Sequence, residues 1–185
     1  GNVLEEHGLG VRGLESVVPP VTVPAWACCF SGLRPDSLEC FDFQSLDFDE
    51  SEFVPVNREV FNHEGYWNYA DESSTLFDVP GADRPEMDGC FVGGIFDFGE
   101  VVTEPEGLAE RLEEEVGSPD IRRMGKLGSE EERRGEARRI FQFRTEVLEW
   151  LVENRDEEVF FSVFRLPDTT MHHTDSKREM VRSYD

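Results

Sequence analysis

The chain has 185 residues, of which 41 are acidic and 18 are basic, so its formal net charge at pH 7 is -23. A field this negative repels nucleic acid and anionic membranes, and it favours basic protein surfaces as partners. Hydrophobic residues make up 38% of the chain, enough for a packed core, but no run reaches the ~18–20 apolar positions that a membrane span requires.

The negative charge is concentrated in the first half of the chain. Residues 1–100 carry 20 acidic and 4 basic side chains, whereas residues 101–185 carry 21 and 14. We expect the cations of the second half to pair with nearby Glu side chains and with the acidic first half; the alternative is a patch for an anionic surface on a partner. These cations gather in one region: Arg122, Arg123, Lys126, Arg133, Arg134, Arg138, Arg139 and Arg144.

The first 25 residues are rich in Pro and Val. Pro19, Pro20 and Pro24 argue against a helix and a central strand, because proline lacks the amide hydrogen that both use. Residues 1–25 are therefore predicted to form an extended arm, anchored by the apolar run 26–30. No basic region followed by an apolar run occurs here, so we expect no secretory signal.

The four cysteines, Cys28, Cys29, Cys40 and Cys90, are too few and too unevenly spaced for a disulfide framework. Reduced thiols in an intracellular compartment, cytoplasmic or nuclear, are therefore expected. The chain has no Cys-x-x-Cys pair, so a zinc site would require Cys28, Cys29, Cys40 and His63 to converge through folding.

The segment 38–53 alternates acidic with bulky apolar residues. Such alternation has two interpretations: an edge strand or folded loop with one face in water, or a recognition segment that docks aromatic anchors on a basic partner. Asp47, Asp49 and Ser51 also begin like a calcium-binding loop, but Glu52 and Arg58 stand where such a loop requires Gly and Glu. The apolar members are Leu38, Phe41, Phe43, Leu46, Phe48 and Phe53, and the acidic members are Glu39, Asp42, Asp47, Asp49, Glu50 and Glu52.

Short strands are predicted at 52–56, 75–79 and 90–102, the last interrupted at Gly93-Gly94 by a turn or a bulge. Between the first two lies a dense aromatic cluster: Tyr66, Trp67 and Tyr69. Core packing is the default for such rings, but exposed Tyr and Trp are also the residues of binding hot spots.

Two capping boxes predict helices in the second half. Thr103 with Glu106 precedes an apolar stripe that Gly117 ends, and a short helix is expected from Ser118 to Gly128. Ser129 with Glu132 opens the clearest helix of the chain, which runs to Asn154. Its apolar stripe follows the spacing of one buried face: Ala137, Ile140, Phe141, Val147, Leu148 and Leu151.

The segment from Val159 to Leu166 follows this helix directly and is predicted to be a strand that Pro167 ends. Both of its alternating faces are largely apolar, which indicates a central strand covered on both sides. The fold class is therefore predicted to be α+β. A small mixed or antiparallel sheet from the first half and Val159–Leu166 is covered by helices from residues 104–154. A single domain is expected over 26–167, followed by a polar, partly mobile tail over 168–185.

The absence of a catalytic motif, together with the acidity and the acidic–aromatic stretches, predicts a non-enzymatic protein without a cofactor or metal. We expect it to inhibit or regulate a partner by docking a basic protein surface, as a viral or other pathogen antagonist of a host factor would. The candidate site residues are Phe41, Asp42, Phe43, Asp47, Phe48, Asp49, Glu50, Tyr66, Trp67 and Tyr69.

Two other classes stay open. A DNA mimic would use rows of surface carboxylates to occupy a nucleic-acid-binding cleft. A cysteine hydrolase would use Cys28 or Cys29 with His63, His172 or His173, although no local motif supports that pairing.

Overall fold

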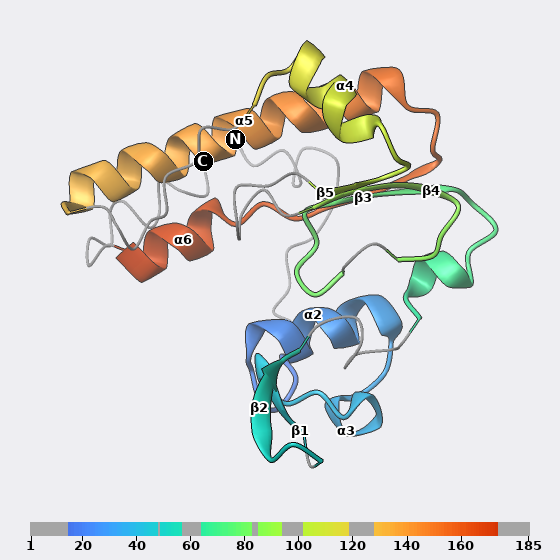
Figure 1. The fold of residues 1–185 in the computed structure, drawn as a ribbon, viewed down its shortest axis with the longest axis vertical. Coiled ribbons are helices and arrows are strands. Elements are labelled where there is room, and N and C mark those ends of the chain that lie inside the picture. Colours follow the sequence, from blue (N-terminus) through green and yellow to red (C-terminus); the bar gives the residue numbers. More distant parts are fainter. Residues whose placement is uncertain are drawn as a thin grey trace. The chain divides into compact units, whose positions relative to one another are not determined.

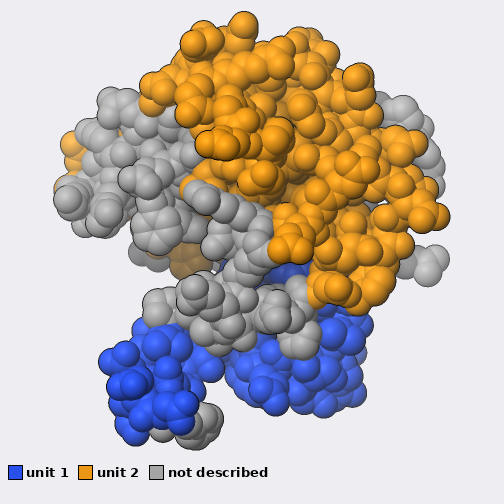
Figure 2. Space-filling view, turned by 45° about the vertical axis from the view of Figure 1, so that its right-hand side comes forward, with its two compact units in different colours: residues 1–63 blue, residues 64–185 orange. Residues whose placement is uncertain are grey.

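The computed structural model (Figure 1) describes residues 15–47, 49–56, 64–82, 85–93, 102–118 and 128–173. The chain divides into two compact units, residues 1–63 and residues 64–185, which Figure 2 shows in different colours. The sequence predicted one domain over 26–167. Hydrophobic periodicity marks which face of a segment is buried, but it does not show which segments share a core.

The described residues of unit 1 form two short helices and one hairpin. Its elements are α2 Thr22–Ser31, α3 Pro35–Leu38, β1 Gln44–Asp47 and β2 Glu52–Pro55, and β1 pairs with β2 in an antiparallel two-stranded sheet. The strand prediction at 52–56 is confirmed. The small core of the unit consists of Pro24, Ala27, Phe30, Pro35, Leu38 and Cys40.

Helix α2 begins at Thr22, so the last residues of the predicted extended arm over 1–25 are helical. Pro24 falls in the first turn, where its missing amide hydrogen has no helical acceptor and its fixed φ suits the helix. The predicted anchor 26–30 is therefore part of the helix. The helix ends at Gly32, whose φ of 70° permits the left-handed cap and whose amide donates to the Cys28 carbonyl at 2.9 Å.

Within the part of unit 2 that the structure describes, four strands form a mixed sheet in the order β5-β4-β3-β6. Central β3 pairs in parallel with both β4 and β6, and β4 pairs antiparallel with β5. With the helices that cover it, this sheet confirms the predicted α+β class and the mixed sheet. The elements are η1 Tyr66–Asn68, β3 Ser74–Phe77, β4 Gly89–Gly93, β5 Val102–Glu104, α4 Leu108–Glu115, α5 Glu130–Asn154, β6 Val159–Ser162 and α6 Leu166–His173.

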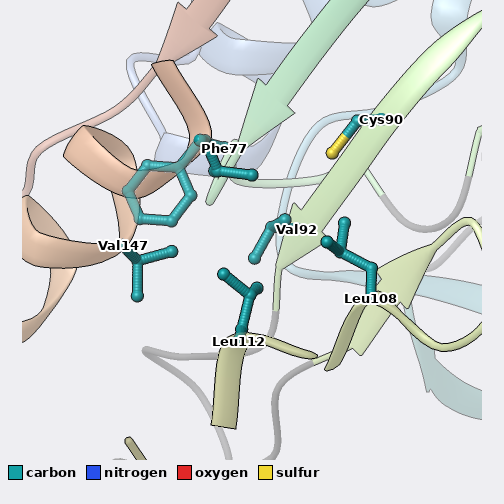
Figure 3. Close-up of a cluster of buried hydrophobic side chains, with 7 residues drawn as sticks. Phe77, Cys90, Val92, Leu108, Leu112 and Val147 are labelled. Carbon is teal, nitrogen blue, oxygen red and sulfur yellow. The ribbon is translucent and has the colours of Figure 1, made fainter. Parts of the chain in front are cut away.

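Helices α4 and α5 cover one face of this sheet (Figure 1). Figure 3 shows the side chains of the sheet pointing toward those of the helices in one buried cluster. The Arg111 guanidinium also lies over the Trp150 ring, 5.0 Å from its centroid, and so joins α4 to α5. The buried cluster comprises Phe77, Cys90, Val92, Leu108, Leu112, Val147 and Leu151.

The opposite face of the sheet carries a row of apolar side chains in register. Leu76 of β3 is paired with Phe91 of β4 and with Phe161 of β6. The Tyr66 ring meets Phe161 edge to face with 5.8 Å between centroids, and Trp67 is buried beside Tyr66. The sheet is therefore covered on both faces, which agrees with the burial of every residue of β3 and of all but the first residue of β4.

The predicted capping box of α5 is confirmed. The Ser129 hydroxyl accepts from the Glu132 amide at 3.1 Å, and the Glu132 carboxylate accepts from the Ser129 amide at 2.9 Å. The second predicted box does not form, because Thr103 and Glu104 belong to β5 and α4 begins after Gly107. The Thr103 hydroxyl still accepts from the Ala109 amide at 3.1 Å, so it caps the first turn from the strand.

Strand β6 is shorter than predicted, and within the described sheet it lies at the edge instead of the centre. Both faces of β6 are apolar because each packs on a different part of unit 2. Phe160 packs on the buried cluster beneath α4 and α5, and Phe161 packs on Tyr66. The predicted polar tail begins inside α6, where Pro167 falls in the first turn and not at a strand end. The helix predicted at 118–128 lies almost wholly outside the described residues.

We predict that Leu151→Ala lowers the free energy of unfolding of unit 2 by about 2–5 kcal/mol, because Leu151 is fully buried in the cluster. The neighbouring Val152 is 55% exposed, so Val152→Ala is the matched control and should change stability by less than about 0.5 kcal/mol. Urea unfolding followed by circular dichroism measures both. Equal stability of the two variants would contradict this placement of α5.

Candidate interaction surface

The β1–β2 hairpin is held by a turn built from an aspartate. The Asp47 Oδ1 accepts from the amides of Asp49 and Glu50 at 2.9 and 3.1 Å, an arrangement that bends the chain back on itself. Ser51 then has a φ of 55°, and Glu52 stands directly opposite Asp47 in the ladder. Two like charges are therefore paired across the strands beside the turn.

The next cross-strand pair is apolar and faces solvent. Leu46 stands opposite Phe53, and the two side chains are 40% and 69% exposed. On the other side of the hairpin, Ser45 and Val54 form the neighbouring pair and are half-buried. The larger pair, Leu46 and Phe53, is thus the more exposed one, and the smaller pair, Ser45 and Val54, is the more buried one. A strand that contributes to a core buries its large apolar side chains instead.

Two further aromatic rings precede β1. Phe41 and Phe43 are each 53% exposed, and the Asp42 carboxylate between them accepts from the Phe43 amide at 2.7 Å. We define the hairpin surface as the four exposed apolar side chains and the carboxylates interleaved with them. Its members are Phe41, Phe43, Leu46 and Phe53 with Asp42, Asp47, Asp49, Glu50 and Glu52.

The hairpin surface has no cation of its own. Residues 38–56 contain six acidic and no basic residues. The basic side chain of residues 15–56 is Arg34, which bonds to Asp36 at 3.1 Å beside α3. The carboxylates of the hairpin surface therefore project a negative field around its apolar members.

The structure separates the ten candidate residues into three groups. Phe41, Asp42, Phe43, Asp47, Asp49 and Glu50 lie together in unit 1 on or beside the hairpin, Phe48 lies outside the described residues, and Tyr66, Trp67 and Tyr69 lie in unit 2.

Of the aromatic cluster in unit 2, Trp67 is buried, and Tyr66 is half-buried against Phe161, so both rings belong to the core, while Tyr69 is exposed. The candidate site residues chosen from the sequence did not include Leu46, Glu52 and Phe53, which the structure places in the hairpin surface. Their signal was available, since two short alternating runs on either side of an Asp-rich turn are typical of a hairpin.

Three of the four cysteines have thiol pKa values shifted away from that of a nucleophile. Burial raises the pKa of the Cys28 thiol, and it likewise raises that of Cys40. In unit 2, burial raises the pKa of Cys90 to about 11. A catalytic thiol requires the opposite shift, because the thiolate is the attacking species. Of the histidines considered as its partner, His63 lies outside the described residues.

No group of three or more His, Cys, Asp or Glu side chains is arranged to hold a metal ion in the part of the chain that the structure describes. Nor does any helix among those residues combine the length and apolar character that crossing a bilayer requires.

A buried ion pair, which the sequence did not reveal, lies where β3 ends. Asp78 follows β3 with a φ of 54°, and its amide donates to the Val92 carbonyl at 2.7 Å. Its Oδ2 lies 2.7 Å from an Arg144 guanidinium nitrogen, and the two side chains are 5% and 2% exposed. Arg165, from the segment after β6, approaches the other oxygen at 3.9 Å.

Arg144 joins three parts of unit 2. Besides its ion pair, the guanidinium donates to the Val163 carbonyl and lies 5.6 Å from the ring centroids of both Phe77 and Phe164. These contacts connect α5 with β3 and with the segment after β6. We assign this cluster a structural role, because its charges are enclosed.

No known protein family, curated protein or solved structure matches this chain.

We predict that Asp78→Asn lowers the free energy of unfolding by about 3–5 kcal/mol, because it leaves the Arg144 charge buried without its carboxylate. Asparagine tolerates the left-handed backbone of this position, so the variant isolates the charge. Asp71→Asn, at an exposed site of the same unit, is the matched control. Thermal melts of both variants test this, and coincident melting curves would show the ion pair to be dispensable.

Proposed function

We propose that this chain is a non-enzymatic acidic protein that inhibits or regulates a partner by docking its hairpin surface on a basic protein surface. The observation that supports this most directly is the outward-facing Leu46–Phe53 pair, with Phe41 and Phe43 close by in sequence. Exposed apolar side chains in one small element, with charge around them, are typical of a protein interface.

The charges indicate what kind of partner fits. Apolar anchors supply affinity, and the surrounding carboxylates supply steering toward cations and discrimination against anions. A partner of this chemistry has an apolar centre rimmed by Lys and Arg. Proteins present such surfaces where they bind anions, and covering one would block that function. An antagonist carried by a virus or another pathogen is one setting in which such blocking would serve.

We place this action inside the cell. The described cysteines are all free thiols, which accords with a reducing compartment.

We predict that the triple variant F41A/F43A/F53A loses partner binding while its melting temperature stays nearly unchanged, because the three rings are exposed in the free protein. A random dodecapeptide library displayed on phage, selected on the immobilised full chain, should enrich peptides that combine Lys or Arg with apolar residues. The triple variant should enrich them about tenfold less, since truncating one interface aromatic commonly removes 1–2 kcal/mol of affinity or more.

A matched control for this experiment is F41Y/F43Y, which keeps both rings and should retain most of the enrichment. Selection of peptides without a basic bias, or equal enrichment on the wild type and the triple variant, would contradict the proposed function.

We also predict that association is fast and sensitive to salt. Steering by a chain with a net charge of -23 fades as ions screen the field, so raising NaCl from about 50 to about 500 mM should lower the association rate constant by about tenfold. Stopped-flow mixing with the most enriched peptide measures this rate. The dissociation rate should change much less, and an association rate that does not respond to salt would remove steering from the proposal.

A further inference from the structure

The hydrogen-bond pattern of the hairpin shows which backbone groups point away from it. The Val56 amide donates to the Phe43 carbonyl at 2.8 Å, so residues 43 and 56 form a hydrogen-bonded pair. In an antiparallel ladder such pairs alternate with pairs whose amides and carbonyls point outward. With the observed register, Gln44 and Leu46 direct their backbone groups outward from β1, and Phe53 and Pro55 do so from β2.

The two edges of the hairpin differ in what they offer. Pro55 has no amide hydrogen, so the β2 edge lacks one of its two outward donors, a common protection of exposed edges. The β1 edge has both, because Gln44 and Leu46 each present an amide and a carbonyl. Among the described residues, no further strand pairs with this edge, and both side chains are exposed.

We propose that the free edge of β1 accepts an extended segment of the partner as a third strand of the sheet. This inference rests on the proposed function and specifies how the hairpin surface would bind. Strand addition obtains affinity from backbone hydrogen bonds and specificity from alternate side chains. The edge supplies the first through Gln44 and Leu46, and the surrounding side chains supply the second.

The register of the hairpin specifies the partner's sequence pattern. Leu46 and Phe53 form an apolar pair on one face, and the adjacent pair, Asp47 and Glu52, is acidic and lies on the other face, with Asp47 half-buried and Glu52 exposed. Side chains of an added strand alternate between the same two faces. The fitting segment is therefore an extended peptide in which apolar and basic residues alternate.

The test uses a capped heptapeptide in which lysine and valine alternate, and a control peptide of the same composition with the two residues in separate blocks. Hydrogen exchange of the isotope-labelled full chain is followed by NMR with and without each peptide. The Gln44 and Leu46 amides should exchange about tenfold more slowly at saturation with the alternating peptide, because exchange then requires the added strand to detach. The Phe53 amide points outward at the other edge and should be unaffected.

A pair of variants tests the same donor directly. Gln44→Pro removes one outward amide hydrogen without removing a β1–β2 hydrogen bond, and Gln44→Ala keeps that hydrogen while removing the side chain. The alternating peptide should bind the proline variant about tenfold more weakly and the alanine variant within about twofold of the wild type. The exchange experiment on the wild-type chain decides the matter if the proline variant does not fold.

Three results would overturn the inference. If the alternating peptide binds without slowing the Gln44 and Leu46 amides, or slows Phe53 in their place, the third strand is not formed at β1, and the hairpin surface still takes basic partners. If this peptide fails to bind while basic library peptides bind, strand addition is wrong and the proposed function stands. If neither binds, the proposed function fails as well.

Discussion

The buried pair of Asp78 and Arg144 is the constraint on which the arrangement of unit 2 depends. A guanidinium that is 2% exposed requires a carboxylate and carbonyl oxygens at defined positions, because an uncompensated charge in a protein interior is very costly. Meeting this requirement fixes the rotation of α5 about its axis. Val147 and Leu151 follow on the same helical face, three and seven residues after Arg144, and reach the sheet as a consequence.

The same pair also limits where the chain can go after β6. Arg144 donates to the Val163 carbonyl, and Phe164 packs on Phe77 and Phe141. At the opposite end of the sheet, the Glu157 carboxylate accepts from Thr75 at 3.1 Å and from Arg155. Burial acts to raise the pKa of Glu157, but the hydrogen bonds from Arg155 and the protein backbone outweigh it and hold the pKa below its usual value. The residues that flank β6 are thus bonded to β3 or to its neighbour Asp78, directly or through Arg144, at both ends of the strand.

Unit 1 differs from unit 2 in that several of its large apolar side chains are exposed and not packed in a core. Phe30 and Leu38 are buried, whereas Phe41, Phe43 and Phe53 are exposed beside carboxylates. The acids also restrict what can pair with the open edge of β1. Two copies of this chain would bring Asp47 and its acidic neighbours together and repel each other, while a basic strand would be attracted. Charge can therefore keep an exposed edge from self-association and leave it available to a partner.

Composition was sufficient for the net charge, and local patterns were sufficient to place helix α5 with its Ser129 cap, β2, β3 and the start of β4. These features depend on composition or on residues within a few positions of one another, so local patterns report them. The start of α2 at Thr22 was missed because Pro24 is compatible with a first turn, a distinction that composition does not make.

Local patterns could not predict which aromatic residues are exposed or which carboxylate pairs with Arg144. Phe43 and Trp67 both occur in acidic–aromatic stretches, yet the Phe43 ring is exposed and the Trp67 ring is buried. Trp67 packs against Tyr66, and Tyr66 packs against Phe161, which lies more than ninety positions later in the chain. Likewise, Arg144 reads as one of a row of surface cations until β3 places Asp78 beside it. Burial and pairing of this kind arise from contacts between residues distant in sequence, which local spacing does not encode.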